Sequence, residues 1–172
     1  MRHIVTLVLL LVIVGAEAAM WVVNPLHVPE AFLPARALGV QMFDEPGTAM
    51  QPGLAAGRSI IVSSWAYWHD SPRVGDIVAF AYPRDASVAD VKRIVAVGGS
   101  TVEIRGGVLY VDGSRPDEPY LDAGSAQTDR SMAKLTVPPD CYFVMGDKRD
   151  DSEDSRNYGC IARDRIIGRL WR

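Results

Sequence analysis

The chain has 172 residues, of which 48% are hydrophobic and 23% charged, with a formal net charge of −3. This length predicts one modest globular domain, and the composition excludes the low hydrophobicity of a disordered chain. The charge balance lacks the basic surplus of a nucleic-acid-binding protein, so we expect no nucleic-acid partner.

The N-terminal segment directs the rest of the chain out of the cytoplasm. Residues 4–15 are uncharged and follow the basic Arg2, and the small-x-small sequence Ala16-Glu17-Ala18 comes next. These features are typical of a cleavable signal peptide. Continued through residues 19–23, the segment is also long enough for a membrane anchor, although Glu17 counts against that interpretation.

After the N-terminal segment, prolines interrupt residues 24–45, which predicts a connector without a long helix. Downstream, short β-branched runs are separated by Gly, Pro and Asp, the pattern of an antiparallel β barrel or sandwich. The predicted strands are 59–63, 76–81, 91–97, 101–104, 108–111, 141–145 and 165–170. Arg105-Gly106-Gly107 predicts a hairpin, and residues 112–136 predict a polar surface excursion.

Two cysteines, Cys141 and Cys160, lie in the exported part. In an oxidising compartment an isolated pair is more often a disulfide than a metal site, so we expect them to be joined. His3, His27 and His69 have no ligand spacing, and we predict neither a metal nor another cofactor.

Three segments have unusual residue orders: 46–54 (PGTAMQPGL), 91–95 (VKRIV) and 145–156 (MGDKRDDSEDSR). Singly, they are typical of a turn, a strand with a solvent-facing lysine, and a solvated loop. Together and in this order they resemble the type I signal peptidase family, over residues 46–171. The sequence departs from the family pattern at Lys148 and Gly53, and it has Gly98-Gly99-Ser100 where the family has Pro-Gly-Asp.

The most important departure is Ala49, which occupies the position of the family's serine nucleophile. The resemblance implies Lys92 as general base, which requires a neutral amine of the kind that burial among Val91, Ile94 and Val95 favours. Because a methyl group cannot attack a carbonyl, we expect this chain to be inactive as written.

The resemblance also implies supporting roles around this dyad. Ser152 would orient Lys92, and the backbone at Ala49, with Gly47, would stabilise the oxyanion. Asp154 and Arg156 would pair to hold their loop. The complete set of implied supporting residues is Met50, Pro52, Arg93, Asp147, Arg149, Asp154, Ser155 and Arg156.

The resemblance favours a retained anchor at residues 1–23, a connector at 24–45 and an extracytoplasmic β-rich domain at 46–172. It implies a single-pass protein of the cytoplasmic (inner) membrane, in contact with lipid. The implied activity is serine endopeptidase cleavage after small-x-small sites, with signal peptides of exported preproteins as partners.

Alternative hypotheses remain for the function. A naturally non-catalytic relative would bind signal peptides without cutting them, as Ala49 allows. An engineered knockout explains one lost hydroxyl in an otherwise intact site. We favour it because a lysine kept in an apolar strand destabilises the protein once its catalytic role is gone. A specialised peptidase for pilin or conjugation precursors would share the dyad. A self-cleaving repressor is remote because the chain has no DNA-binding segment.

Overall fold

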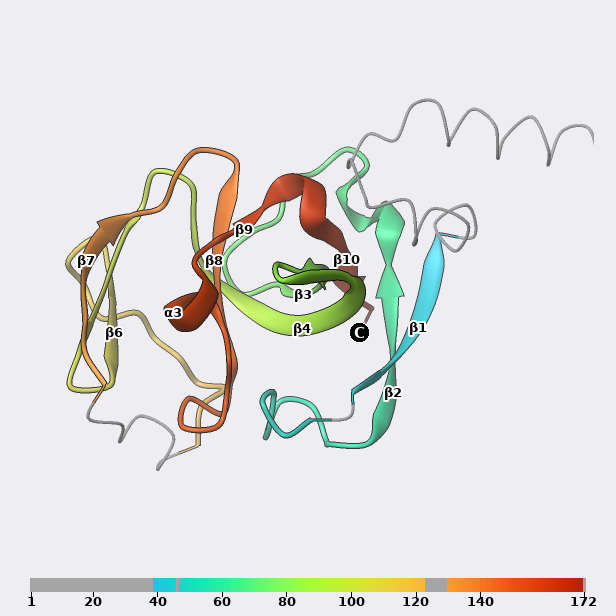
Figure 1. The fold of residues 1–172 in the computed structure, drawn as a ribbon, viewed down its shortest axis with the longest axis horizontal. Helices are drawn as coiled ribbons and strands as arrows, with labels where there is room; N and C mark the ends of the chain where they lie inside the picture. The colour runs from blue at the N-terminus through green and yellow to red at the C-terminus, as the bar shows by residue number, and fades with distance from the viewer. Residues whose placement is uncertain (1–38, 46, 123–129, 172) are drawn as a thin grey trace, which may run out of the picture.

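The computed structural model describes residues 39–45, 47–122 and 130–171, which fold into two antiparallel sheets (Figure 1). The larger sheet has seven strands in the order β1-β2-β10-β3-β4-β8-β9. Its strands are β1 (Val40–Glu45), β2 (Arg58–Ser63), β3 (Ile77–Tyr82), β4 (Asp85–Val97), β8 (Cys141–Met145), β9 (Ile161–Ala162) and β10 (Ile166–Leu170). The predicted mostly β, antiparallel class is confirmed.

The smaller sheet has the order β6-β5-β7 and lies at one end of the domain (Figure 1). It consists of β5 (Thr101–Arg105), β6 (Val108–Val111) and β7 (Met132–Thr136). Arg105 pairs with Val108 across the β5–β6 turn, which confirms the predicted hairpin. Three short helices complete the described part of the chain: η2 (Ser64–Tyr67), α3 (Ser155–Tyr158) and η3 (Arg163–Arg165).

Two hydrophobic cores share strand β8, all five residues of which are buried. Tyr142 and Val144 belong to the first core, whereas Cys141, Phe143 and Met145 belong to the second. Because successive side chains on a strand point to opposite faces, this division shows that β8 is covered on both sides. The loop that follows β8 therefore begins at a rigid, central position.

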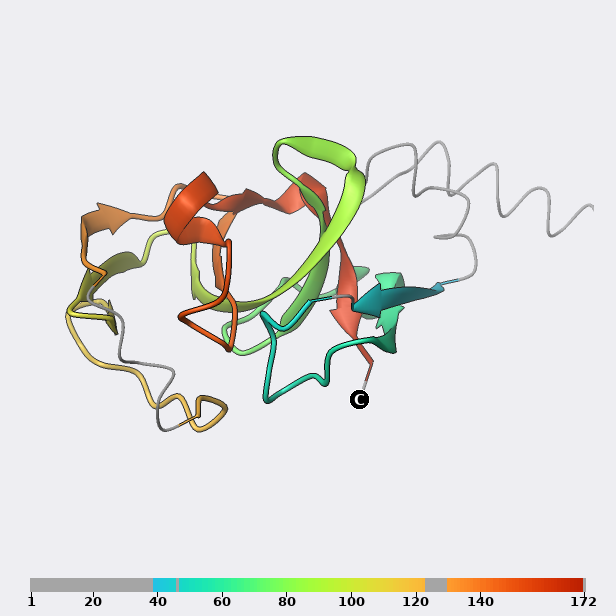
Figure 2. The same ribbon diagram turned by 60° about the horizontal axis from the view of Figure 1, so that its bottom comes forward.

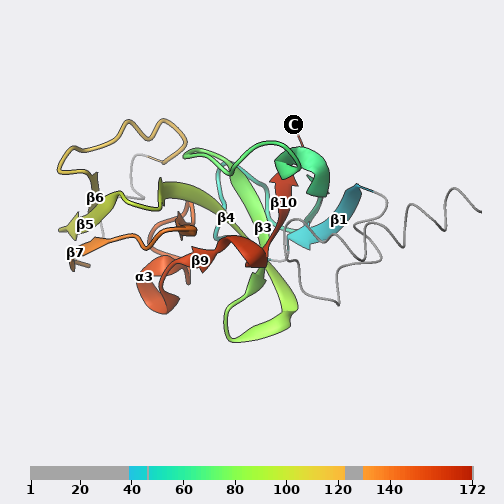
Figure 3. The ribbon, with the colours of Figure 1, turned by 90° about the horizontal axis from the view of Figure 1, so that it is seen from above.

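Strand β4 is the longest strand and carries the predicted general base. Figure 2 shows it curving around the body of the domain, and Figure 3 shows its hairpin with β3 projecting from that body. The strand is exposed at its start and buried from Val91 to Ala96. The pairing of β4 with β8 shifts register between Ile94 and Ala96, as expected for a strand that bends.

The seven predicted strands all occur, with ends that differ by a residue or two except at β4, whose N-terminal half was missed. Sequence patterns also missed β1, β7 and the two-residue β9, and β7 lies inside the predicted surface excursion at 112–136. Among the described residues, no helix is long and apolar enough to span a membrane. The predicted anchor at 1–23 lies outside the described residues.

The predicted disulfide is present between Cys141 and Cys160, with their Cα atoms 5.8 Å apart. Cys141 begins β8 and Cys160 immediately precedes β9, which pairs with β8. The disulfide therefore joins the two ends of the segment between these strands. That segment contains the polar loop, residues 145–156, which is predicted to belong to the site.

Candidate active site

The turn that carries Ala49 is held between the first core and the polar loop. The Met50 side chain is fully buried in the first core, and its carbonyl accepts from the Leu54 N–H at 2.8 Å. On the other side, Thr48 Oγ1 donates to Asp151 Oδ2 at 2.5 Å. Ala49 lies between these two attachments and is only partly buried.

The polar loop also contacts the Ala49 backbone directly. The Lys148 N–H donates to the Ala49 carbonyl at 2.9 Å. At Gly146 a Cβ atom would lie 2.6 Å from the same carbonyl and would overlap the Ser152 hydroxyl. Only glycine permits this approach, so Gly146 brings the segments of Ala49 and Ser152 together.

Lys92 faces the same cleft as Ala49. The cleft has a volume of about 340 Å³, and the Lys92 residue is only 4% exposed. Both predicted oxyanion residues, Ala49 and Gly47, contribute to the lining. The lining residues are Phe43, Gly47, Ala49, Tyr82, Val88, Ala89, Asp90, Val91, Lys92 and Glu153.

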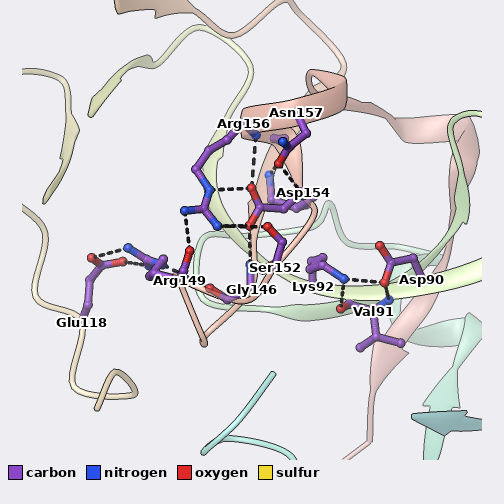
Figure 4. A network of polar contacts seen from close by, with 12 residues as sticks. Asp90, Val91, Lys92, Glu118, Gly146, Arg149, Ser152, Asp154, Arg156 and Asn157 are labelled. Carbon is purple, nitrogen blue, oxygen red and sulfur yellow. Dashed lines mark hydrogen bonds and ion pairs between the residues drawn. The ribbon is translucent and has the colours of Figure 1, made fainter. Parts of the chain in front are cut away.

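The polar partners of Lys92 differ from those that the resemblance implies. Its Nζ donates to Asp90 Oδ1 at 2.5 Å and to the Val91 carbonyl at 3.1 Å. The Ser152 hydroxyl is buried without a hydrogen-bond partner; it adjoins the Asp154 carboxylate, but no hydrogen bond of ordinary geometry joins them. In Figure 4 the Lys92 amine points toward Asp90 and away from Ser152.

The residue after Lys92 ties β4 to the polar loop. Arg93 donates through Nε and Nη2 to both Asp147 carboxylate oxygens, at 2.8 and 2.7 Å. Its Nη1 donates to the Gly75 carbonyl at 2.9 Å, and the guanidinium lies 4.0 Å from the centre of the Tyr120 ring. Because Arg93 and Asp147 are both buried, this two-pronged pair fixes where the loop begins.

Asp154 and Arg156 hold the other end of the loop (Figure 4). Arg156 donates through Nε and Nη2 to the two Asp154 oxygens, both at 2.7 Å, and the Gly146 N–H donates to Asp154 Oδ2 at 3.0 Å. Burial alone would raise the pKa of the Asp154 carboxyl. The hydrogen bonds and charge of Arg156, with the Gly146 N–H, hold that pKa below its ordinary value.

Arg149 and Ser155 complete the support of the loop. The buried Arg149 forms an ion pair with Glu118 and donates to the Gly146 carbonyl at 3.1 Å. The Ser155 hydroxyl accepts the Val144 N–H at 2.9 Å, which links α3 to β8.

The structure thus brings Gly47, Ala49 and Lys92 to the lining of one cleft, and Ser152, whose hydroxyl is buried, lies outside that lining. Sequence analysis missed Asp90 and Glu118. Asp90 had a readable signal, since residues two apart on a strand share a face and Asp90 precedes Lys92 by two. Glu118 had none, because the contact with its arginine joins residues 31 positions apart.

The chain is similar to known proteins over most of its length. Residues 18–171 match the family model described as "Signal peptidase, peptidase S26". The chain is 34% identical over 130 residues to a "Probable signal peptidase I-1" of Synechocystis, covering 72% of this chain and 65% of that relative. It is 35% identical over 130 residues to "Signal peptidase I T" of Bacillus subtilis, covering 71% and 67%.

The chain therefore spans slightly less than two thirds of the Synechocystis protein. A crystal structure of a signal peptidase I from Enterococcus faecalis matches with a TM-score of 0.53 and 32% identity, covering 59% of this chain and 98% of that one. The family match covers most of the sequence, including all three segments that form the site. The chain belongs to the signal peptidase family, peptidase S26.

Proposed function

We propose that this domain binds the signal peptides of exported precursors in the cleft between Ala49 and Lys92. The observation that carries the proposal is that this cleft joins the nucleophile position to a buried lysine. The same cleft would support serine endopeptidase chemistry if residue 49 had a hydroxyl. With alanine there, the chain binds its peptide without cutting it.

In a chain with serine in place of Ala49, the reaction would proceed in two steps. The introduced hydroxyl would supply an oxygen that attacks the scissile carbonyl, while neutral Lys92 accepts its proton. Backbone N–H groups near Ala49 and Gly47 would stabilise the oxyanion. The departing amine takes the proton from Lys92, and water then hydrolyses the ester, restoring the hydroxyl and releasing the signal peptide.

The bound peptide would lie extended along the cleft. Alternate side chains of an extended peptide point the same way, so two small residues separated by one would enter the cleft together. Ala89 and Val91, two apart on β4, offer apolar surface to such side chains. This accounts for a small-x-small preference without a charged recognition group.

We further propose that residues 1–23 anchor the domain at the outer face of the cytoplasmic membrane. The apolar N-terminal segment supports this placement. Signal peptides are themselves held in the bilayer, so an anchored domain would meet them at a high effective concentration.

The test compares the full chain with its Ala49→Ser variant, in detergent, on a labelled precursor peptide that has a small-x-small site. The chain with Ala49 should bind the peptide in a fluorescence polarisation assay without cutting it, and Ala49→Ser should yield the cleavage product by mass spectrometry. In the serine background, Lys92→Ala and Lys92→Arg should both abolish cleavage, because neither side chain accepts the proton. Failure of the chain with Ala49 to bind precursor peptides would overturn the proposal.

A further inference from the structure

We propose that Asp90 holds Lys92 in an ion pair directed away from Ser152, and so forms a second barrier to catalysis beyond the missing serine. The inference rests on the proposed function, in which Lys92 is the general base. It assigns Asp90 as a positioning residue that determines whether the lysine is available to accept a proton.

The Asp90 carboxylate is fixed where Lys92 meets it. Asp90 and Lys92 share one face of β4, and Asp90 Oδ1 accepts both the Lys92 amine at 2.5 Å and the Val91 N–H at 2.8 Å. The Lys92 side chain is 5% exposed and that of Asp90 is 24% exposed. The pair is therefore largely shielded from water, where a charge-assisted hydrogen bond is stronger than at the surface.

The Ser152 hydroxyl, which the resemblance implies as the group that orients Lys92, lies beside the Asp154 carboxylate and makes no hydrogen bond to the lysine. The buried Ser152 hydroxyl makes no hydrogen bond of ordinary geometry, and leaving such a group unsatisfied is unfavourable. Gly146 lies against both Ser152 and the Ala49 carbonyl, so Ser152 adjoins the nucleophile position. Lys92 thus faces Asp90, on the opposite side from the serine that would direct it toward residue 49 (Figure 4).

The other carboxylates around this cleft have partners of their own. Glu153, from the polar loop, pairs with Arg84 at 3.0 Å and accepts the Tyr82 hydroxyl at 3.0 Å. Behind it, Asp154 is paired with Arg156. On α3, burial and the neighbouring Asp90 charge raise the pKa of the Tyr158 phenol, which stays neutral. Because Glu153 and Asp154 are already paired, Asp90 is the carboxylate that remains to pair with Lys92.

This pairing opposes general-base catalysis. A base must be unprotonated when the nucleophile loses its proton, and an adjacent carboxylate stabilises the ammonium instead. Replacing Asp90 by asparagine removes the charge but keeps the size and an acceptor oxygen. Burial then favours the neutral amine, which is free to turn toward Ser152.

The first measurement needs no activity. The chain has three lysines, Lys92, Lys134 and Lys148, so carbon-13 labelling at lysine Cε gives an NMR spectrum that single substitutions can assign. In the full chain with Ala49, Asp90→Asn should lower the pH at which the Lys92 signal titrates, because the carboxylate that stabilises the ammonium is gone.

The matched control is Asp85→Asn, which removes the same charge from the same strand outside the cleft and should leave the Lys92 titration unchanged. Asp90→Ala provides a second variant if the asparagine chain does not fold. An unchanged Lys92 titration in folded Asp90 variants would overturn the inference.

The second measurement uses cleavage. At neutral pH, Ala49→Ser combined with Asp90→Asn should cut a precursor peptide faster than Ala49→Ser alone, by about tenfold for each pH unit by which the Lys92 titration falls. The advantage should shrink at high pH. Equal rates and equal pH profiles would refute a role for Asp90. If the titration shifts but both serine variants bind peptide and remain inert, the proposed dyad fails while the Asp90–Lys92 pairing stands.

Discussion

The buried pair of Arg93 and Asp147 provides the sharpest stability test of how this site is held together. The side chain of Arg93 is 6% exposed and that of Asp147 is not exposed. The pair joins β4, next to the proposed base, to the loop that contacts Ala49. Asp147→Ala would leave the guanidinium buried with only the Gly75 carbonyl and the Tyr120 ring as partners.

The expected loss of stability depends on which charge stays buried after the substitution. Removing one partner of a buried, hydrogen-bonded ion pair typically destabilises a protein by about 3–5 kcal/mol, because the remaining charge has lost its hydration and its counter-ion. Replacing both partners by apolar residues of similar size costs much less. We therefore expect Asp147→Ala to lower the free energy of unfolding by about 3–5 kcal/mol, and Arg93→Met with Asp147→Leu to lower it by less.

The assay is urea unfolding of the full chain in detergent, followed by far-ultraviolet circular dichroism. The control is Asp70→Asn, which breaks an ion pair with Arg73 whose side chains are 63% and 71% exposed. That change should leave the unfolding midpoint unchanged, since exposed pairs contribute little. A loss of under about 1 kcal/mol for Asp147→Ala, or a double variant less stable than the single one, would refute the reasoning.

Other predictions concern the disulfide, the acid response and the N-terminus. The unreduced protein should show no free thiols, and replacing Cys141 and Cys160 by alanine should lower the free energy of unfolding by about 3 kcal/mol, from the loop that they close; unchanged stability would contradict this. Because the pKa of Asp154 is lowered in the folded chain, its stabilising contribution is present above the ordinary value of 3.8 and lost as pH falls through the folded pKa. Asp154→Asn should therefore flatten the pH dependence of stability measured below about pH 4, and an unaltered slope would count against the assignment. If residues 1–23 anchor the protein, it should remain in the membrane fraction after a carbonate wash, whereas a soluble form beginning at Ala19 would show cleavage instead.

The sequence predicted the strands that are buried, because burial imposes the pattern from which strands are recognised. The three missed strands, β1, β7 and β9, all lie at sheet edges. β9 has only two residues, and β1 and β7 bury little. Met42 of β1 is 70% exposed, and β7 contains no fully buried residue. At an edge, only one neighbour and part of one face constrain the sequence, so the apolar alternation is weak. The polar composition of residues 112–136 therefore obscured β7.

At the site, the order of motifs identified which segments belong together, but not how their polar groups pair. The Arg93–Asp147 contact joins residues 54 positions apart, and only the folded chain shows which arginine meets which carboxylate. The Asp90–Lys92 pair is different, because strand alternation alone places both side chains on one face. The apolar neighbours of Lys92 offered a reason for its amine to be neutral, and the carboxylate beside it was overlooked.

Asp90 also bears on the origin of Ala49. The sequence alone favours an engineered loss of one hydroxyl, because a buried lysine without its catalytic role would be an unpaired, desolvated charge. In the structure that lysine has a counter-ion, so its presence no longer favours an engineered change. An engineered and a natural origin of Ala49 predict that different substitutions restore cleavage. A chain that lost only its serine should regain rapid cleavage with Ala49→Ser, whereas a domain adapted to hold peptides uncut should also need Asp90→Asn, because its lysine remains paired until that carboxylate is removed.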